Sequence, residues 1–130
     1  MNKIKILLVD DHDSFRRVLA SFLRAQQGVE LVGEAIDGDD AIEQSNRLSP
    51  DLVLIDVHMP RRNGVEATRT IKGLNPRTKV IMMSVDSSES YQRSALQIAD
   101  AYIPKISIKE NLSFILGNFA HPEQGQMAVA

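Results

Sequence analysis

Short apolar runs alternate along the chain with segments whose apolar residues recur at helical spacing. Runs of branched or large apolar side chains predict buried strands over residues 4–9, 31–36, 52–55 and 80–83, and a shorter strand over 101–103. The run 52–55 is the most apolar and is expected to be the central strand. Strands of this kind separated by helices predict a parallel sheet with helices on both of its faces.

Five helical segments are expected between and after these strands. Apolar residues at helical spacing predict helices over 15–23, 41–48, 65–74 and 108–119. The segment 87–98 is polar and rich in serine, and it predicts a helix with few apolar anchors. The fold class is therefore α/β.

Composition narrows the class of protein further. A chain of 130 residues predicts one domain, over 1–120, and residues 121–130 lack a core pattern and are expected to form a disordered tail. The absence of cysteine excludes disulfides and thiolate metal sites, and a net charge of −2 argues against a general nucleic-acid binder. No apolar run is long enough to span a membrane, and the first apolar run stops too early for a signal peptide, so a cytoplasmic location is expected.

Polar residues follow or close four of the predicted strands: Asp10 and Asp11, then Asp56, Ser84 and Lys105. Because the carboxyl ends of parallel strands meet at one edge of a sheet, these side chains are expected to share a pocket. Grouped carboxylates suit Mg²⁺, with Asp11 and Asp56 as direct ligands and Asp10 acting through water. A hydroxyl and an ammonium beside that ion suit a phosphoryl group, and a carboxylate such as Asp56 can become an acyl phosphate.

Each of these residues also has a simpler explanation. Asp11 or Asp13 could cap the helix that follows, and Asp13 fits that cap better. Asp56 could be an ordinary residue at a strand end, Ser84 could bond a local amide, and Lys105 could be a solvated surface lysine.

Other metal and nucleotide sites find no support in the sequence. His12, His58 and His121 are too dispersed along the chain to predict a zinc site. No P-loop and no glycine-rich dinucleotide motif occurs.

Five stretches then carry a more specific pattern. They are ILLVDDH at 6–12, PDLVLIDVHMP at 50–60, NG at 63–64, VIMMS at 80–84 and YIPK at 102–105. Their order and spacing resemble the receiver domain of two-component response regulators, and the details are most similar to receivers that precede a helix-turn-helix output domain. The resemblance implies a flavodoxin-like three-layer sandwich with five helices and a five-stranded parallel sheet of order 2-1-3-4-5.

The resemblance also implies a phosphoacceptor site. A histidine kinase or phosphotransfer protein would donate a phosphoryl group to Asp56. Mg²⁺ would bind Asp11, Asp56 and the backbone carbonyl of His58, with Asp10 in support through water.

A switch accompanies that site in the family. Lys105 would pair with the phosphoryl group, Ser84 would move toward it, and Tyr102 would rotate inward with the serine. His58 and Asp86 hold the positions that the family links to dephosphorylation rate, although Asp86 could equally cap the fourth helix.

Two departures from the family pattern concern the region around the lysine. Many relatives have proline directly after this lysine, whereas here Pro104 precedes Lys105 and Ile106 follows it. The segment 95–101 is one residue shorter than usual, which predicts a different end to the fourth helix.

Four functions are compatible with these patterns. The main hypothesis is a stand-alone phosphoacceptor that signals through a protein target or homodimer at the fourth helix, fifth strand and last helix, and whose only chemistry is its own phosphorylation and dephosphorylation. The alternative is a receiver fragment of a DNA-binding transcriptional regulator, with no nucleic-acid or membrane binding expected of this chain itself. A Mg²⁺-dependent phosphohydrolase and a receiver that no longer accepts phosphate are the remaining possibilities.

Overall fold

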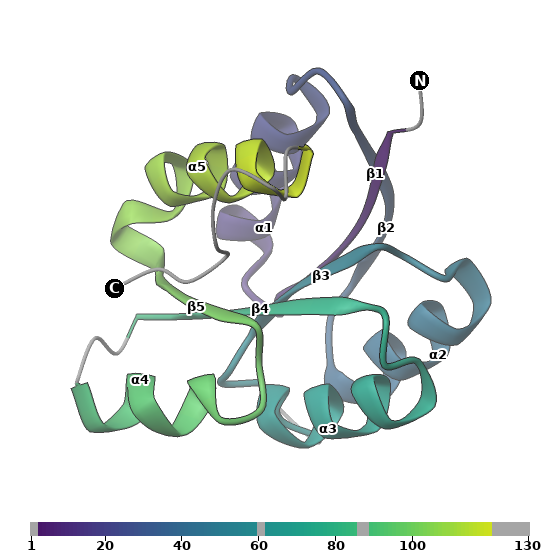
Figure 1. The fold of residues 1–130 in the computed structure, drawn as a ribbon, viewed down its shortest axis with the longest axis vertical. Helices are drawn as coiled ribbons and strands as arrows, with labels where there is room; N and C mark the ends of the chain where they lie inside the picture. Colours follow the sequence, from purple (N-terminus) through teal and green to yellow (C-terminus); the bar gives the residue numbers. More distant parts are fainter. Residues whose placement is uncertain (1–2, 60–61, 86–88, 121–130) are drawn as a thin grey trace.

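The chain folds around one parallel sheet of five strands. The computed structural model describes residues 3–59, 62–85 and 89–120, so the expected tail and Asp86 lie outside it. The strand order is β2-β1-β3-β4-β5, which confirms the expected order and the central place of the most apolar strand (Figure 1). The strands are β1 (Ile4–Val9), β2 (Val29–Ala35), β3 (Leu52–Asp56), β4 (Lys79–Ser84) and β5 (Ala101–Pro104).

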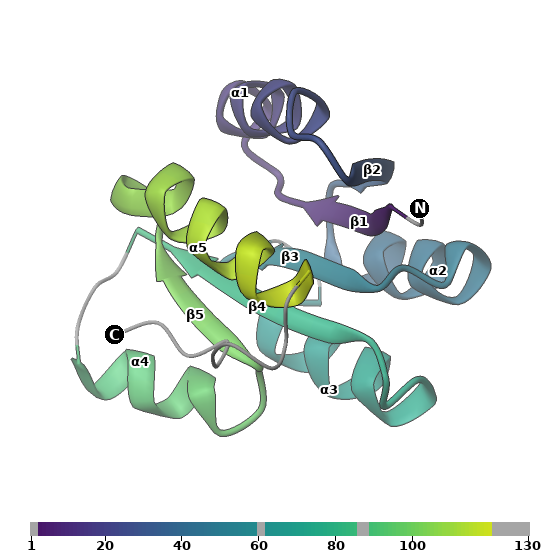
Figure 2. The same ribbon diagram turned by 45° about the horizontal axis from the view of Figure 1, so that its top comes forward.

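Helices cover both faces of the sheet and complete three layers. Figures 1 and 2 show α1 and α5 on one face and α2, α3 and α4 on the other. The helices are α1 (Asp13–Arg24), α2 (Gly38–Leu48), α3 (Gly64–Leu74), α4 (Glu89–Leu96) and α5 (Ile108–Ala120), with the 3₁₀ turn η1 (Lys105–Ser107) before the last. No helix within the described ranges is long and apolar enough to cross a membrane.

Apolar side chains pack on both faces because both faces are covered. Along β1, Ile6 and Leu8 join the core beneath α1 and α5, whereas Leu7 and Val9 join the core against α2, α3 and α4. All five residues of β3 are buried. This explains why the strands appear in the sequence as continuous apolar runs rather than as alternating ones.

The fourth helix is shorter than the predicted 87–98, since its described part ends at Leu96. Asp100 holds the turn that follows. Its carboxylate accepts a hydrogen bond from the backbone N–H of Val80 at 2.8 Å and pairs with Lys72 at 2.6 Å. The turn is thus fixed to the amino end of β4, and the peptide bond before Pro104 in the next strand is trans.

The register brings the carboxyl ends of the inner strands to one edge. Val9 pairs with Ile55, Asp56 with Met83, and Ser84 lies beside the last residue of β5. The residues that follow β1, β3 and β5 therefore emerge close together, as the sequence predicts for a parallel sheet.

Helix α3 lies against the end of β3 through a glycine, which gives the first prediction. A Cβ at Gly64 would overlap the backbone carbonyl oxygen of Asp56, whereas a Cβ at Gly73 in the same helix would have open space around it. We expect Gly64→Ala to lower the free energy of unfolding by about 1–3 kcal/mol. The matched change Gly73→Ala should raise it by about 0.5–1 kcal/mol, because it reduces the freedom of the unfolded chain. Urea denaturation measures both, and equal effects of the two variants would contradict the close approach at Gly64.

Candidate functional site

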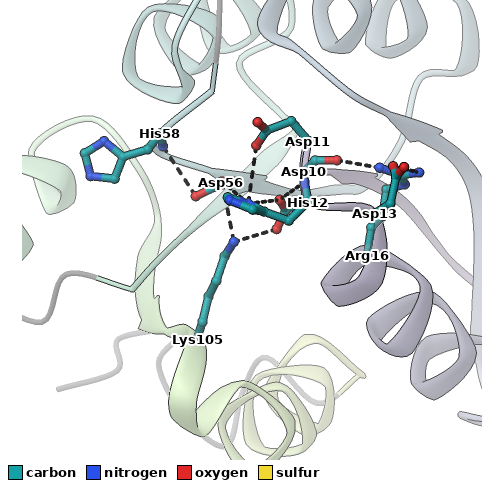
Figure 3. Close-up of polar contacts among 8 residues, drawn as sticks. All are labelled: Asp10, Asp11, His12, Asp13, Arg16, Asp56, His58 and Lys105. Carbon is teal, nitrogen blue, oxygen red and sulfur yellow. Dashed lines mark hydrogen bonds and ion pairs between the residues drawn. The ribbon is translucent and has the colours of Figure 1, made fainter.

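Asp10 and Asp56 lie side by side at the carboxyl edge of the sheet. Asp10 directly follows β1 and Asp56 ends β3, and both are buried, at 0% and 2% exposure. Lys105 begins the turn after β5 and reaches across to them (Figure 3). Its Nζ lies 2.7 Å from Asp10 Oδ2 and 3.4 Å from Asp56 Oδ2. The structure therefore brings together three of the predicted site residues from distant parts of the chain.

Lys105 is not the solvated surface lysine of the simpler explanation. Its side chain is only 7% exposed. Its Nζ also lies 4.5 Å from the centroid of the Phe15 ring on α1, a cation–π contact. The aromatic ring and the two carboxylates together hold the ammonium inside the site.

Asp11 and His12 complete a cluster of possible metal ligands. Nδ1 of His12 lies 3.1 Å from Asp10 Oδ1, 3.4 Å from Asp11 Oδ1 and 3.6 Å from Asp56 Oδ2. One ligand atom from each of these four residues lies within 4.8 Å of all the others. The group is therefore compact enough to surround a single ion.

The carboxylate oxygens of this cluster fit a divalent cation. Asp11 Oδ1 and Asp56 Oδ2 are buried and accept no hydrogen bond from the described residues, although Asp56 Oδ2 lies in an ion pair with Lys105. A buried charged oxygen without a hydrogen bond is unfavourable, and the three carboxylates of the cluster outnumber the lysine beside them. Hard carboxylate oxygens are the donors that Mg²⁺ prefers.

Asp56 experiences this excess of negative charge directly. Burial and the charge of Asp10 raise the pKa of Asp56, and the effect exceeds the opposing influence of Lys105 and of the His58 N–H. That N–H donates to Asp56 Oδ1 at 3.3 Å, while the imidazole of His58 points away from the acids in Figure 3. The site thus favours any added positive charge.

The start of α1 differs from the expected cap. His12 occupies the N-cap position and its side chain makes no capping bond. Asp13 instead lies in the first turn and pairs with Arg16 at 2.9 Å, so the prediction that Asp13 caps the helix is wrong. At this position the carboxylate faces the side chain three residues further along the helix, which explains the ion pair.

Arg16 supports the site, a role that the sequence alone does not predict. Its Nη1 donates to the backbone carbonyl of Asp10 at 2.8 Å, and its Nε donates to Glu34 on β2 at 3.0 Å. Burial acts to lower the pKa of Arg16, but hydrogen bonds and charge from Asp13 and Glu34 outweigh it and raise the pKa. An arginine one turn into the helix after an Asp-Asp pair was the available signal. Arg16 fixes the strand end that carries the acids.

The two expected switch residues are both fully buried. Ser84 closes β4 with 0% exposure, at the edge where Asp56 lies. Tyr102 on the neighbouring strand β5 also has 0% exposure. Their roles in switching stay predictions.

Comparison with known proteins now gives the family. The chain matches the sequence model described as the response regulator receiver domain over residues 6–115. The chain belongs to this family. It is a receiver domain of two-component response regulators, as the sequence resemblance predicted.

Named relatives agree with this assignment. Transcriptional regulatory protein DegU of Brevibacillus brevis is 38% identical over 105 residues, which are 80% of this chain and 44% of that protein. Response regulator protein VraR of Staphylococcus epidermidis is 39% identical over 112 residues, which are 85% of this chain and 53% of that protein. The receiver described here spans about half the length of these relatives.

Solved structures share the fold. The signal receiver domain of NarL from Mycobacterium tuberculosis has a TM-score of 0.85 and 27% identity, and the match covers 93% of this chain and 98% of that one. The response regulator domain of CheB from Thermotoga maritima has a TM-score of 0.80 and 30% identity, and the match covers 92% and 96%.

The raised pKa of Asp56 gives the second prediction. A group whose pKa is higher in the folded state favours folding below its unfolded value, and this contribution is lost as pH rises through the folded value. In EDTA, Asp56→Asn should therefore be more stable than wild type, by about 1–3 kcal/mol at neutral pH, because it removes a buried charge that Lys105 and the His58 N–H compensate only in part. The difference should shrink as pH falls toward about 4.

Urea denaturation between these pH values measures that difference. Glu30→Gln removes an exposed carboxylate with the same change of net charge and serves as the control. A stability difference for Asp56→Asn that does not depend on pH would contradict the account.

The contacts of Arg16 give the third prediction. Arg16→Gln should lower the free energy of unfolding by about 1.5–3 kcal/mol, since it removes charged hydrogen bonds to Asp10 and Glu34. Arg17→Gln, at an exposed neighbouring position, should change it by no more than about 0.5 kcal/mol. Chemical denaturation of both variants tests this, and equal losses would show that the Arg16 contacts contribute little.

Proposed function

We propose that Asp56 accepts a phosphoryl group from a histidine kinase or a phosphotransfer protein. The observation that carries this proposal is the position of the Asp56 carboxylate, which is buried beside Asp10 and lies 3.4 Å from the Lys105 ammonium. A carboxylate oxygen attacks phosphorus as the nitrogen–phosphorus bond of the donor phosphohistidine breaks. The product is an acyl phosphate, and the donor imidazole leaves with the bonding electron pair.

The residues around Asp56 would compensate the negative charge of the transferring phosphoryl group in two ways. Asp11, Asp56 and the His58 carbonyl would hold Mg²⁺, with Asp10 acting through water, and the bound ion would neutralise charge on the transferring phosphoryl oxygens. The Lys105 ammonium would compensate part of the negative charge of the incoming phosphoryl group. Its position is set by Phe15 and Asp10, so it needs little reorganisation when the phosphoryl group arrives.

Phosphorylation would then change the surface around β5, the edge strand of the sheet. The new group adds about −1.5 to −2 charge and strong acceptor oxygens beside Lys105 and Ser84. We propose that Ser84 moves toward these oxygens and that Tyr102 adjusts with it, since both are buried on adjacent strands. The surface of α4, β5 and α5 would change with them and contact a protein target or a second copy of the chain.

The relatives favour one further proposal about the output. DegU is named a transcriptional regulatory protein, and a structure described as a LuxR-family regulator from Aurantimonas has a TM-score of 0.88 at 25% identity. Because the chain covers about half of its curated relatives, we propose that the receiver controls a DNA-binding domain in a longer regulator. Hydrolysis of external phosphoesters finds less support, because His58 stands where such enzymes commonly have a second aspartate.

Phosphorylation of this chain gives the fourth prediction. With Mg²⁺ and acetyl phosphate, intact-protein mass spectrometry should show the mass of one added phosphoryl group. Asp56→Asn should lose this product, because the amide is not a competent nucleophile. Asp39→Asn should retain it, since Asp39 is an exposed aspartate paired with Arg62. EDTA should suppress the product in wild type, and Lys105→Met should lower its yield by at least roughly tenfold, by analogy with the loss of one charged donor.

Failure would take a clear form in this experiment. Wild type that gains no phosphoryl group in Mg²⁺ would contradict the proposal. An Asp56→Asn variant that gains it as efficiently as wild type would contradict the assignment of Asp56.

A further inference from the structure

The imidazole of His12 lies among the three carboxylates of the site. Its Nδ1 is 3.1, 3.4 and 3.6 Å from oxygens of Asp10, Asp11 and Asp56 respectively (Figure 3). The sequence predicts no role for this ring, because the histidines are dispersed along the chain. The fold brings the ring close to Asp56, which is far from it in the sequence, and so completes a cluster that the order of residues does not show.

These separations are those of neighbouring ligands on one ion. Ligands at about 2.1 Å from a metal ion lie about 3 Å from one another in an octahedral site and about 3.4 Å from one another in a tetrahedral site. Nδ1 of His12 is near that separation from oxygens on three residues at once. A ring nitrogen that served only as a hydrogen-bond donor needs one such neighbour, and Asp10 already provides it.

Among the described residues, the His12 ring makes no hydrogen bond or ion pair other than those with the carboxylates. His12 is the N-cap residue of α1, yet its side chain makes no capping bond, and it is 60% exposed. Two oxygens that face it, Asp11 Oδ1 and Asp56 Oδ2, are buried without a hydrogen-bond partner. The exposed ring leaves the cluster open to an ion from solvent, and the Lys105 ammonium offsets only part of the charge of its three carboxylates.

We propose that Nδ1 of His12 is a nitrogen ligand for divalent ions that accept imidazole, such as Zn²⁺. Imidazole suits zinc, copper and nickel, whereas Mg²⁺ takes oxygen donors. The site would then bind Mg²⁺ through oxygens alone and Zn²⁺ through oxygens and the ring. This inference rests on the proposed function for the location of the ion, and it adds a second metal preference to the same site.

Isothermal titration of the full chain with Mg²⁺ and with Zn²⁺ measures that preference. His12→Gln should weaken Zn²⁺ binding by roughly tenfold or more and change Mg²⁺ binding by less than about twofold. His121→Gln is the matched control, because it makes the same change at a histidine far along the chain from these residues. It should leave the Zn²⁺ affinity close to that of wild type.

Nitrogen NMR of the histidine side chains provides a test that needs no variant to fold. In wild type labelled with ¹⁵N, one equivalent of Zn²⁺ should shift Nδ1 of His12 to the range of metal-bound imidazole, and Mg²⁺ should not. A Zn²⁺ shift confined to His58 or His121, or a His12 nitrogen that does not respond, would overturn the inference. Unchanged Zn²⁺ affinity in His12→Gln would overturn it as well.

The two proposals fail in different ways. Wild type that binds Mg²⁺ and takes up phosphate, with no response of His12 to Zn²⁺, would leave the proposed function intact and remove the nitrogen ligand. Wild type that binds neither ion would remove both.

Discussion

Repulsion among three carboxylates at one edge of the sheet is the constraint on which the site depends. Asp10 directly follows β1 and Asp56 ends β3, and the pairing of Val9 with Ile55 holds their backbones close together. Asp11 follows directly and adds a third charge. The fold therefore holds negative charge at a place where burial makes it unfavourable.

Each neighbouring feature acts on this charge. Lys105 compensates part of it, and the Phe15 ring and the two buried acids hold its ammonium in place. Arg16 fixes the backbone of Asp10 from outside, through bonds to the carbonyl and to Glu34. Burial and the charge of Asp10 together raise the pKa of Asp56, and the negative charge that Lys105 leaves uncompensated is available to attract a cation. A site that gains a cation can then accept a phosphoryl group without excessive repulsion.

The sequence alone was enough to predict the parallel sheet and the convergence of Asp10, Asp11 and Asp56 at one edge of it. Strand ends at Val9, Ile55 and Met83 are visible as places where apolar runs meet polar residues, and the parallel-sheet rule brings them together. The helix ends were less predictable. Asp13 has the composition of a cap, but its ion pair with Arg16 depends on which residue begins the helix, and local propensity leaves that choice open.

Contacts between side chains of different helices and strands were the hardest to predict. The burial of Lys105 depends on a ring from α1, and the position of the His12 ring depends on β3. The full burial of Tyr102 follows from packing of helices on β5, which strand periodicity does not report. These contacts join segments that are far apart in the chain, and local patterns in a single sequence do not predict them.

We propose that this convergence makes Asp56 the one carboxylate that accepts a phosphoryl group. Borohydride reduction converts an acyl phosphate of aspartate to homoserine, and peptide sequencing by mass spectrometry then locates it. After treatment with Mg²⁺ and a small phosphodonor, we expect homoserine at position 56 and at no other aspartate. Homoserine at Asp10 or Asp11, or at no position while wild type is folded and bound to Mg²⁺, would contradict it.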